Sequence, residues 1–135
     1  MLQPKKTKKI VSQKGRKKGI SPNTQKLRFG DFGLVSLNAC VISLKTFESV
    51  RRILTRATLR KALIYLCAAC DTSVSKKALG IRMGKGKGSH TYWAAKISAG
   101  QILVEIKGIN TSLALEALKR ITYKLPCNSR IIMRW

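Results

Sequence analysis

Glycine and lysine alternate near the middle of the chain, in a segment whose residue types could bind phosphate. Glycine allows positive φ angles and a close approach of the backbone to an anion, while lysine supplies positive charge. This combination predicts a flexible cationic finger, and an ordinary glycine-rich hairpin turn is the alternative. The finger, residues 82–88, consists of Arg82, Met83, Gly84, Lys85, Gly86, Lys87 and Gly88.

The finger does not have the spacing of a nucleotide-binding loop. The pattern G-x-x-x-x-G-K-[ST] is absent, because the fifth residue after Gly80 is Lys85. The dinucleotide pattern G-x-G-x-x-G fails as well, since its last position falls on Ser89. No helical pattern follows closely, so the helix N-terminus that both mechanisms need is missing.

Groups for acid–base catalysis are scarce. The chain has five Asp and Glu residues, scattered along the sequence, and one histidine. General acid–base chemistry and magnesium binding both need such groups to converge on one place. We therefore predict that the protein is not an enzyme and uses no cofactor.

Four cysteines raise the question of a metal site. Cys67 and Cys70 form a single C-x-x-C pair, whereas Cys40 and Cys127 stand alone in the sequence. A structural zinc site usually needs two such pairs. Cys67 also lies in an apolar run, which is typical of a small buried thiol. We expect no metal site, and the lack of a secretory leader predicts reduced thiols.

Positive charge is the dominant property of the chain. Its 135 residues include 28 Lys and Arg but only 5 Asp and Glu, which gives a formal net charge of +23. Such self-repulsion is costly to a folded protein, and a polyanionic partner would remove that cost. No apolar run approaches the roughly 18 residues of a membrane-spanning helix, so we predict no membrane partner. Nucleic acid is the expected partner.

The first 28 residues concentrate this charge without any periodicity. Proline and glycine interrupt the segment, which predicts an extended arm over residues 1–28 that orders on binding. A solvated tail or a localisation signal is the alternative. The residues of the arm that we expect to bind nucleic acid are Lys5, Lys6, Lys8, Lys9, Lys14, Arg16, Lys17 and Lys18.

Residues 29–135 predict one globular α+β domain, with two amphipathic helices packed on a mostly antiparallel sheet of four to six strands. Strand patterns cover residues 34–37, 40–42 and 129–135, and a continuous apolar run over 63–68 indicates a buried strand. Two further strands, 91–97 and 101–106, are predicted to form a hairpin through residues 98–100.

The first predicted helix begins after Ser43, a suitable N-cap, and the second begins near residue 111. Apolar residues recur at helical spacing on one face of the first helix, and arginines recur four apart on another. Like charges at this spacing destabilise a free helix, and phosphates would remove the repulsion. A solvated surface is the alternative. The arginines expected to bind nucleic acid are Arg51, Arg52, Arg56 and Arg60.

Several segments, taken in order along the chain, match one known family. They begin with residues 1–8 and 14–16 and continue through 29–34 and the arginine-rich helix at 47–56. The most specific segment is the finger followed by Tyr92 and Trp93, and residues 100–108 and 124–126 complete a match that covers essentially the whole chain. In these segments the chain resembles the family of ribosomal protein sixteen of the bacterial-type large subunit.

The resemblance implies a fold described as an α/β hammerhead, consistent with the α+β class predicted from the patterns. It implies binding to large-subunit rRNA, with the arm threaded between rRNA helices. It also implies contacts with neighbouring ribosomal proteins. It also implies that the finger faces the tRNA in the A site near the peptidyl-transferase region, with the P-site tRNA as a further candidate. No homo-oligomer is expected.

Residues 61–72 depart from the family, which has a tryptophan, an arginine and several prolines here. Tyr65 stands near the tryptophan position, but the arginine and prolines are missing. This drift, the lysine-rich composition and the ending at residues 131–135 resemble mitochondrial members. The chain begins at the family's own first residues, without an added presequence. We therefore expect a mitochondrial ribosome, with the bacterial cytoplasm or a plastid as alternatives.

Two other classes of function fit the sequence less well than a ribosomal protein. A DNA-binding architectural protein would share the charge, but the chain lacks dimerisation signals and an apolar wedge for the minor groove. A nucleotide-using enzyme would need the loop spacing and the paired carboxylates that are missing. The DNA-binding protein is the stronger of these alternatives.

Overall fold

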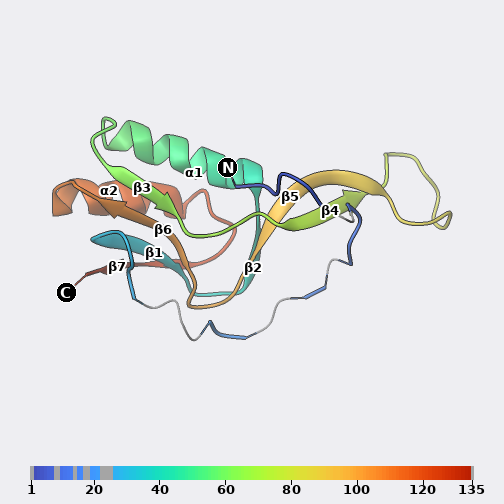
Figure 1. The fold of residues 1–135 in the computed structure, drawn as a ribbon, viewed down its shortest axis with the longest axis horizontal. Coiled ribbons are helices and arrows are strands. Elements are labelled where there is room, and N and C mark those ends of the chain that lie inside the picture. Colours follow the sequence, from blue (N-terminus) through green and yellow to red (C-terminus); the bar gives the residue numbers. More distant parts are fainter. Residues whose placement is uncertain (1, 8–9, 14, 17–18, 22–25, 135) are drawn as a thin grey trace.

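The computed structural model describes residues 2–7, 10–13, 15–16, 19–21 and 26–134 (Figure 1). Within these ranges the chain forms two helices and seven strands. In chain order they are β1 (Phe32–Ser36), β2 (Cys40–Ser43), α1 (Leu44–Ala57), β3 (Leu63–Leu66), β4 (Thr72–Lys76), β5 (Ser89–Ile97), β6 (Ile102–Lys107), α2 (Thr111–Thr122) and β7 (Ser129–Met133).

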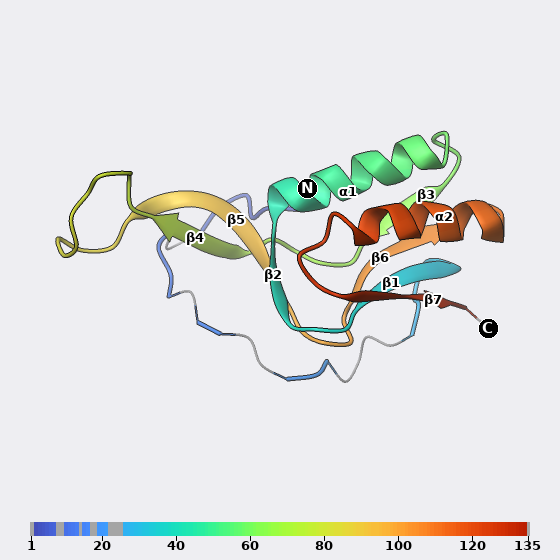
Figure 2. The same cartoon turned by 180° about the vertical axis from the view of Figure 1, so that it is seen from behind.

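The strands form two antiparallel sheets, and both helices cover the larger one. This sheet has the order β3-β6-β1-β7, and the smaller sheet has the order β2-β5-β4. α1 and α2 lie side by side on one face of the four-stranded sheet, while the three-stranded sheet projects away from them (Figures 1 and 2). The predicted α+β class with two helices on a mostly antiparallel sheet is confirmed.

The hairpin predicted between residues 91–97 and 101–106 is wrong. β5 pairs with β2 and β4, whereas β6 pairs with β1 and β3, so the two strands enter different sheets. The chain crosses between the sheets twice at one place, where Ser36 N–H donates to Gln101 O at 2.9 Å and Gly100 N–H donates to Ser36 O at 2.7 Å. Apolar alternation and a glycine predict a strand and a turn, but they do not select the partner strand.

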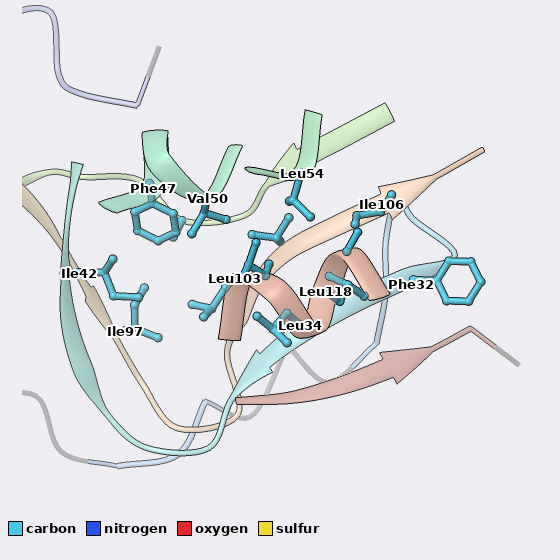
Figure 3. Packing of buried hydrophobic residues seen from close by; sticks show 14 of the residues in the cluster. Phe32, Leu34, Ile42, Phe47, Val50, Leu54, Ile97, Leu103, Ile106 and Leu118 are labelled. Atoms are coloured by element: carbon cyan, nitrogen blue, oxygen red, sulfur yellow. The ribbon is translucent and has the colours of Figure 1, made fainter. Parts of the chain in front are cut away.

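The core lies between the helices and the four-stranded sheet. α1 buries Phe47, Val50 and Leu54, which confirms the predicted apolar face, and the Ser43 side chain caps the helix by accepting from Thr46 N–H at 3.2 Å. These side chains meet Leu103 from β6 and Leu118 from α2 (Figure 3). Each fully buried side chain of this size contributes about 1.5–3 kcal/mol.

The region that departs from the family pattern contains β3 and ends at the first residue of β4. The strand predicted over 63–68 is shorter and less buried than expected, because β3 is an edge strand and Leu63 is 57% exposed. β4 was missed by the sequence patterns and raises the strand number above the predicted four to six. Its sequence, TSVSK, has few apolar residues because one sheet partner and little core surround it.

Candidate nucleic-acid interface

Four arginines surround a cavity of about 620 Å³ at the C-terminal end of α1. Arg51, Arg52 and Arg56 lie on the helix, while Arg60 lies in the turn that follows it. The prediction that Arg60 lies on this helix, four residues after Arg56, is therefore wrong. Leu59 and Arg60 have φ angles of 49° and 61°, and this left-handed turn returns Arg60 to the same cavity.

The charge around this arginine cavity is largely uncompensated. Glu48 pairs with Arg51 at 2.6 Å and with Arg52 at 3.4 Å, and the hydrogen bond from Arg51 lowers the pKa of Glu48 to about 2. In the described part of the chain, Arg56 and Arg60 have no carboxylate partner. Guanidinium groups are well suited to bidentate phosphate binding. Because Arg56 and Arg60 are not ion-paired in the described structure, they could bind a phosphate without breaking an ion pair.

The finger forms the second part of the loop that joins β4 to β5, and it ends at the residue before β5. Gly84, Lys85 and Gly86 have successive φ angles of 91°, 52° and 82°, so the glycines provide conformations that other residues rarely adopt. Met83 is 99% exposed, and the Lys77 ammonium group donates to the Gly84 carbonyl. The structure thus places the finger residues in an exposed β-hairpin loop, and their contact with tRNA stays a prediction.

At the base of this loop, Gly88 packs closely against the end of β4, whereas Gly84 and Gly86 have open space around them. A Cβ atom at Gly88 would lie 2.4 Å from the Lys76 carbonyl carbon and 2.5 Å from the Lys76 oxygen. The two strands of the hairpin can therefore approach each other this closely only with glycine at position 88.

The described parts of the arm contact the domain at several separate places. Leu2 O accepts from Cys70 N–H at 2.9 Å, and Ser21 N–H donates to Ala99 O at 2.8 Å. Between these contacts, the Lys87 ammonium group of the finger donates to Ser12 O. Of the predicted binding residues, Lys5, Lys6 and Arg16 are exposed. The others lie outside the described residues: Lys8, Lys9, Lys14, Lys17 and Lys18.

The arginine cavity and the finger lie far apart. The cavity is at the end of α1 next to β3, whereas the finger is beyond β4 and β5 at the other end of the molecule's long axis (Figures 1 and 2). The predicted binding residues therefore form separate basic surfaces. One protein of this shape can contact parts of a large RNA that are distant from each other.

A buried carboxylate to which the sequence patterns assign no role fixes the end of the arm. Glu105 is 1% exposed, and its Oε2 accepts the backbone N–H groups of Phe29 and Gly30, each at 2.7 Å. Arg28 N–H points to the same carboxylate at 3.2 Å. The signal in the sequence was a single charged residue inside the apolar strand ILVEI, because a buried charge needs hydrogen-bond partners.

The fold brings together the two cysteines that stand alone in the sequence. A hydrogen bond from the Cys40 thiol lowers the pKa of Cys127 to about 6, and the same contact raises the pKa of Cys40. Burial raises the pKa of Cys67 to about 12, and nearby Glu105 adds to this effect. Among the residues that the structure describes, no three potential metal ligands converge, and no helix is both long and apolar enough to cross a membrane.

Comparison with known proteins finds relatives that match nearly the whole chain. The family model described as "Ribosomal protein L16p/L10e" matches residues 4–132. The chain is 43% identical over 133 residues to "Large ribosomal subunit protein uL16m" of Prototheca wickerhamii, covering 98% of both chains. It is 41% identical to "Large ribosomal subunit protein uL16c" of Oedogonium cardiacum, covering 98% of this chain and 96% of that protein.

A bacterial relative shows the same degree of similarity. The chain is 42% identical to "Large ribosomal subunit protein uL16" of Azorhizobium caulinodans, covering 99% of this chain and 98% of the relative. Identity of this size over nearly complete chains, together with a family model that spans both the arm and the domain, confirms the resemblance seen in the sequence. This chain belongs to the ribosomal protein L16p/L10e family.

Proposed function

We propose that this chain is a structural protein of the large ribosomal subunit that binds rRNA and lines the A-site tRNA corridor. Family membership carries the first part of this proposal, because its relatives are large-subunit proteins by name. The finer part rests on geometry. Basic surfaces at both ends of the long axis, with an excess of cations over carboxylates, suit a protein embedded in folded RNA.

The rRNA-binding part is assigned to the arm and the arginine cavity. Arginine and lysine neutralise phosphates, and RNA is recognised largely through its shape and backbone. With roughly ten phosphate contacts, the logarithm of the affinity would fall with the logarithm of salt concentration at a slope near −9 for a duplex partner. Neighbouring ribosomal proteins are further partners in this assembly.

The tRNA-facing part is assigned to the finger. It is exposed and basic, and it lies at the end of the projecting β4–β5 hairpin, so it can reach a ligand without disturbing the core (Figure 1). The A-site tRNA is the proposed ligand, and the P-site tRNA is the second candidate. Both assignments follow from the family resemblance of the finger sequence.

The family also bears on the alternatives. Its members are ribosomal structural proteins and not enzymes, which confirms the prediction that this chain is no enzyme. Neither the family match nor the named relatives support the DNA-binding alternative. The chemistry of translation would belong to the RNA, with this protein positioning it.

We place the protein in a mitochondrial ribosome. The drifted segment 61–72 and the C-terminal residues support this placement, and one of the named relatives is a mitochondrial protein. Chloroplast and bacterial relatives have similar identities, so a plastid and the bacterial cytoplasm are the alternatives. Fractionation of the source cells, followed by detection of the chain in purified mitochondria, tests the placement.

Sedimentation of a native extract tests the function. On a low-salt gradient we expect the chain to migrate with the large ribosomal subunit and to leave it only at high salt, because its contacts are mostly ionic. Migration as a free protein or with DNA would contradict the proposed function.

A further inference from the structure

A cavity lined by two aromatic rings lies between the end of the arm and β3. It has a volume of about 420 Å³, and Phe29, Tyr65 and Leu66 contribute to its wall. The ring centroids of Phe29 and Tyr65 are 5.4 Å apart with an angle of 28° between the planes, so the rings are stacked. Phe29 nevertheless remains 56% exposed. The volume falls within the range of about 300–1,000 Å³ that is typical of small-ligand sites.

The rim of this aromatic cavity is basic. Lys26 and Arg28 belong to its lining, and Lys26 also lines an adjacent cavity of about 570 Å³ together with Arg130 and Arg134. In the described part of the chain, none of these four side chains forms an ion pair. A ligand with an aromatic group and several negative charges would therefore match both the wall and the rim.

The backbone on one side of the cavity is fixed before any ligand binds. The Phe29 N–H group donates to the buried Glu105 carboxylate at 2.7 Å, next to the matching bond from Gly30. Binding to a wall that is already ordered loses less conformational entropy. The same carboxylate would repel a phosphate from the inside of the cavity, which leaves the interior to an uncharged ring and the phosphates to the rim.

We propose that this cavity binds one unstacked base of a single-stranded rRNA segment. The base packs against the Phe29–Tyr65 pair, and the flanking phosphates contact Lys26, Arg28 and the neighbouring arginines. Proteins commonly bind unpaired RNA bases by stacking them on aromatic side chains beside a positively charged groove. This proposal rests on the proposed function, because its partner is RNA. It adds a site that binds a base, whereas the arginine cavity would bind only phosphate.

Fluorescence of a base analogue tests this site with the full-length chain. The probe is a short single-stranded RNA that carries 2-aminopurine, whose emission falls when the base stacks on an aromatic ring. We expect Phe29→Leu to weaken binding about 5-fold to 100-fold and to remove the quenching, because the variant keeps an apolar side chain but loses the ring. Phe29→Trp should retain both properties.

Tyr123→Leu is the matched control. Tyr123 is also an exposed aromatic residue, at 87%, but it lies at the end of α2 and does not line the cavity. Affinity and quenching should be unchanged in this variant, and circular dichroism should show that every variant keeps its fold.

The outcomes separate the base site from the function on which it rests. Equal affinity and equal quenching in the wild type and Phe29→Leu would overturn the base site, while salt-dependent RNA binding would leave the proposed function standing. If an acidic peptide abolishes the quenching while the RNA stays bound with the same affinity, the cavity is the site of a protein partner. This outcome would also overturn the base site. Failure of the wild type to bind any RNA would contradict both proposals.

Discussion

The Glu105 carboxylate accepts a hydrogen bond from the Gly30 backbone N–H at 2.7 Å, and the two residues leave no space between them. A Cβ atom at position 30 would lie 2.8 Å from the Glu105 Cβ atom and equally close to the backbone of Ile106. A side chain is therefore excluded at position 30, because the Glu105 Cβ atom and the Ile106 backbone occupy its space. This contact fixes the point where the arm becomes the domain.

Glu105→Gln should destabilise the domain. A Gln side chain keeps only one acceptor oxygen. If that oxygen keeps the hydrogen bonds from Phe29 and Gly30, the NH₂ group replaces Oε1, which now accepts from Arg28 N–H at 3.3 Å, so two donors face each other in a buried place. We expect a loss of about 1–3 kcal/mol in the free energy of unfolding, measured by urea denaturation. Glu116→Gln is the control, because that carboxylate is exposed and pairs with Arg120 on the surface of α2. An equal effect of both substitutions would show that the buried contact contributes little.

Removing two arginines of the cavity should weaken RNA binding without harming the fold. The double variant Arg56→Gln/Arg60→Gln loses two cations that have no carboxylate partner among the described residues. We expect the slope of the logarithm of rRNA affinity against the logarithm of salt concentration to become shallower by about 2, since about two phosphate contacts are lost. The double variant Lys119→Gln/Arg120→Gln on α2 carries the same change in charge. The same loss in this control would indicate a general effect of charge.

The finger should act on tRNA and not on stability. Lys85→Ala/Lys87→Ala removes two exposed ammonium groups far from the core, so the unfolding free energy should change by less than about 0.5 kcal/mol. Subunits that carry this variant should accommodate A-site tRNA less well than the wild type, as measured by tRNA binding to purified ribosomes. Lys119→Ala/Lys124→Ala is the matched control. Normal tRNA binding with the finger variant would contradict the assignment of the finger.

The contact between Cys40 and Cys127 should be visible as a titration. Thiolate absorbance should show a step near pH 6, because the Cys40 thiol lowers the pKa of Cys127 to about 6. A folded-state pKa below the unfolded value means that the thiolate stabilises the fold at high pH and that this stabilisation is lost as the pH falls through about 6. Cys40→Ala should move the step upward, and Cys67→Ala is the control. An unchanged step in Cys40→Ala would exclude this hydrogen bond as its cause.

Deletion of residues 1–20 should impair assembly more than folding. It removes many of the arm's cations and the Leu2 contact with Cys70, but the contact between Glu105 and Phe29 and Gly30 remains. We expect the truncated chain to unfold cooperatively, with reduced incorporation into the large subunit in a reconstitution assay. Full incorporation would show that the first part of the arm is dispensable.

Local patterns correctly predicted those features that depend on neighbours in the sequence. The spacing of Phe47, Val50 and Leu54 predicted α1 and its buried face, and Ser43 predicted its first turn. The excess of lysine and arginine indicated a nucleic-acid partner, and the order of the motifs indicated the family. β4 was missed because its polar sequence follows no clear alternation, and its hydrogen bonds to β5 define it.

The sequence by itself determined the class of partner, the family and the amphipathic elements, because charge and periodicity are properties of the chain alone. The tertiary structure decided which residues meet. It placed β5 and β6 in different sheets and Arg60 beside the arginines of α1, and it brought the free thiols of Cys40 and Cys127 into contact. It also placed the Glu105 carboxylate beneath residues 28–30, more than seventy positions away. Such contacts depend on strand pairing and on how the chain packs as a whole, and no local pattern of residues encodes them.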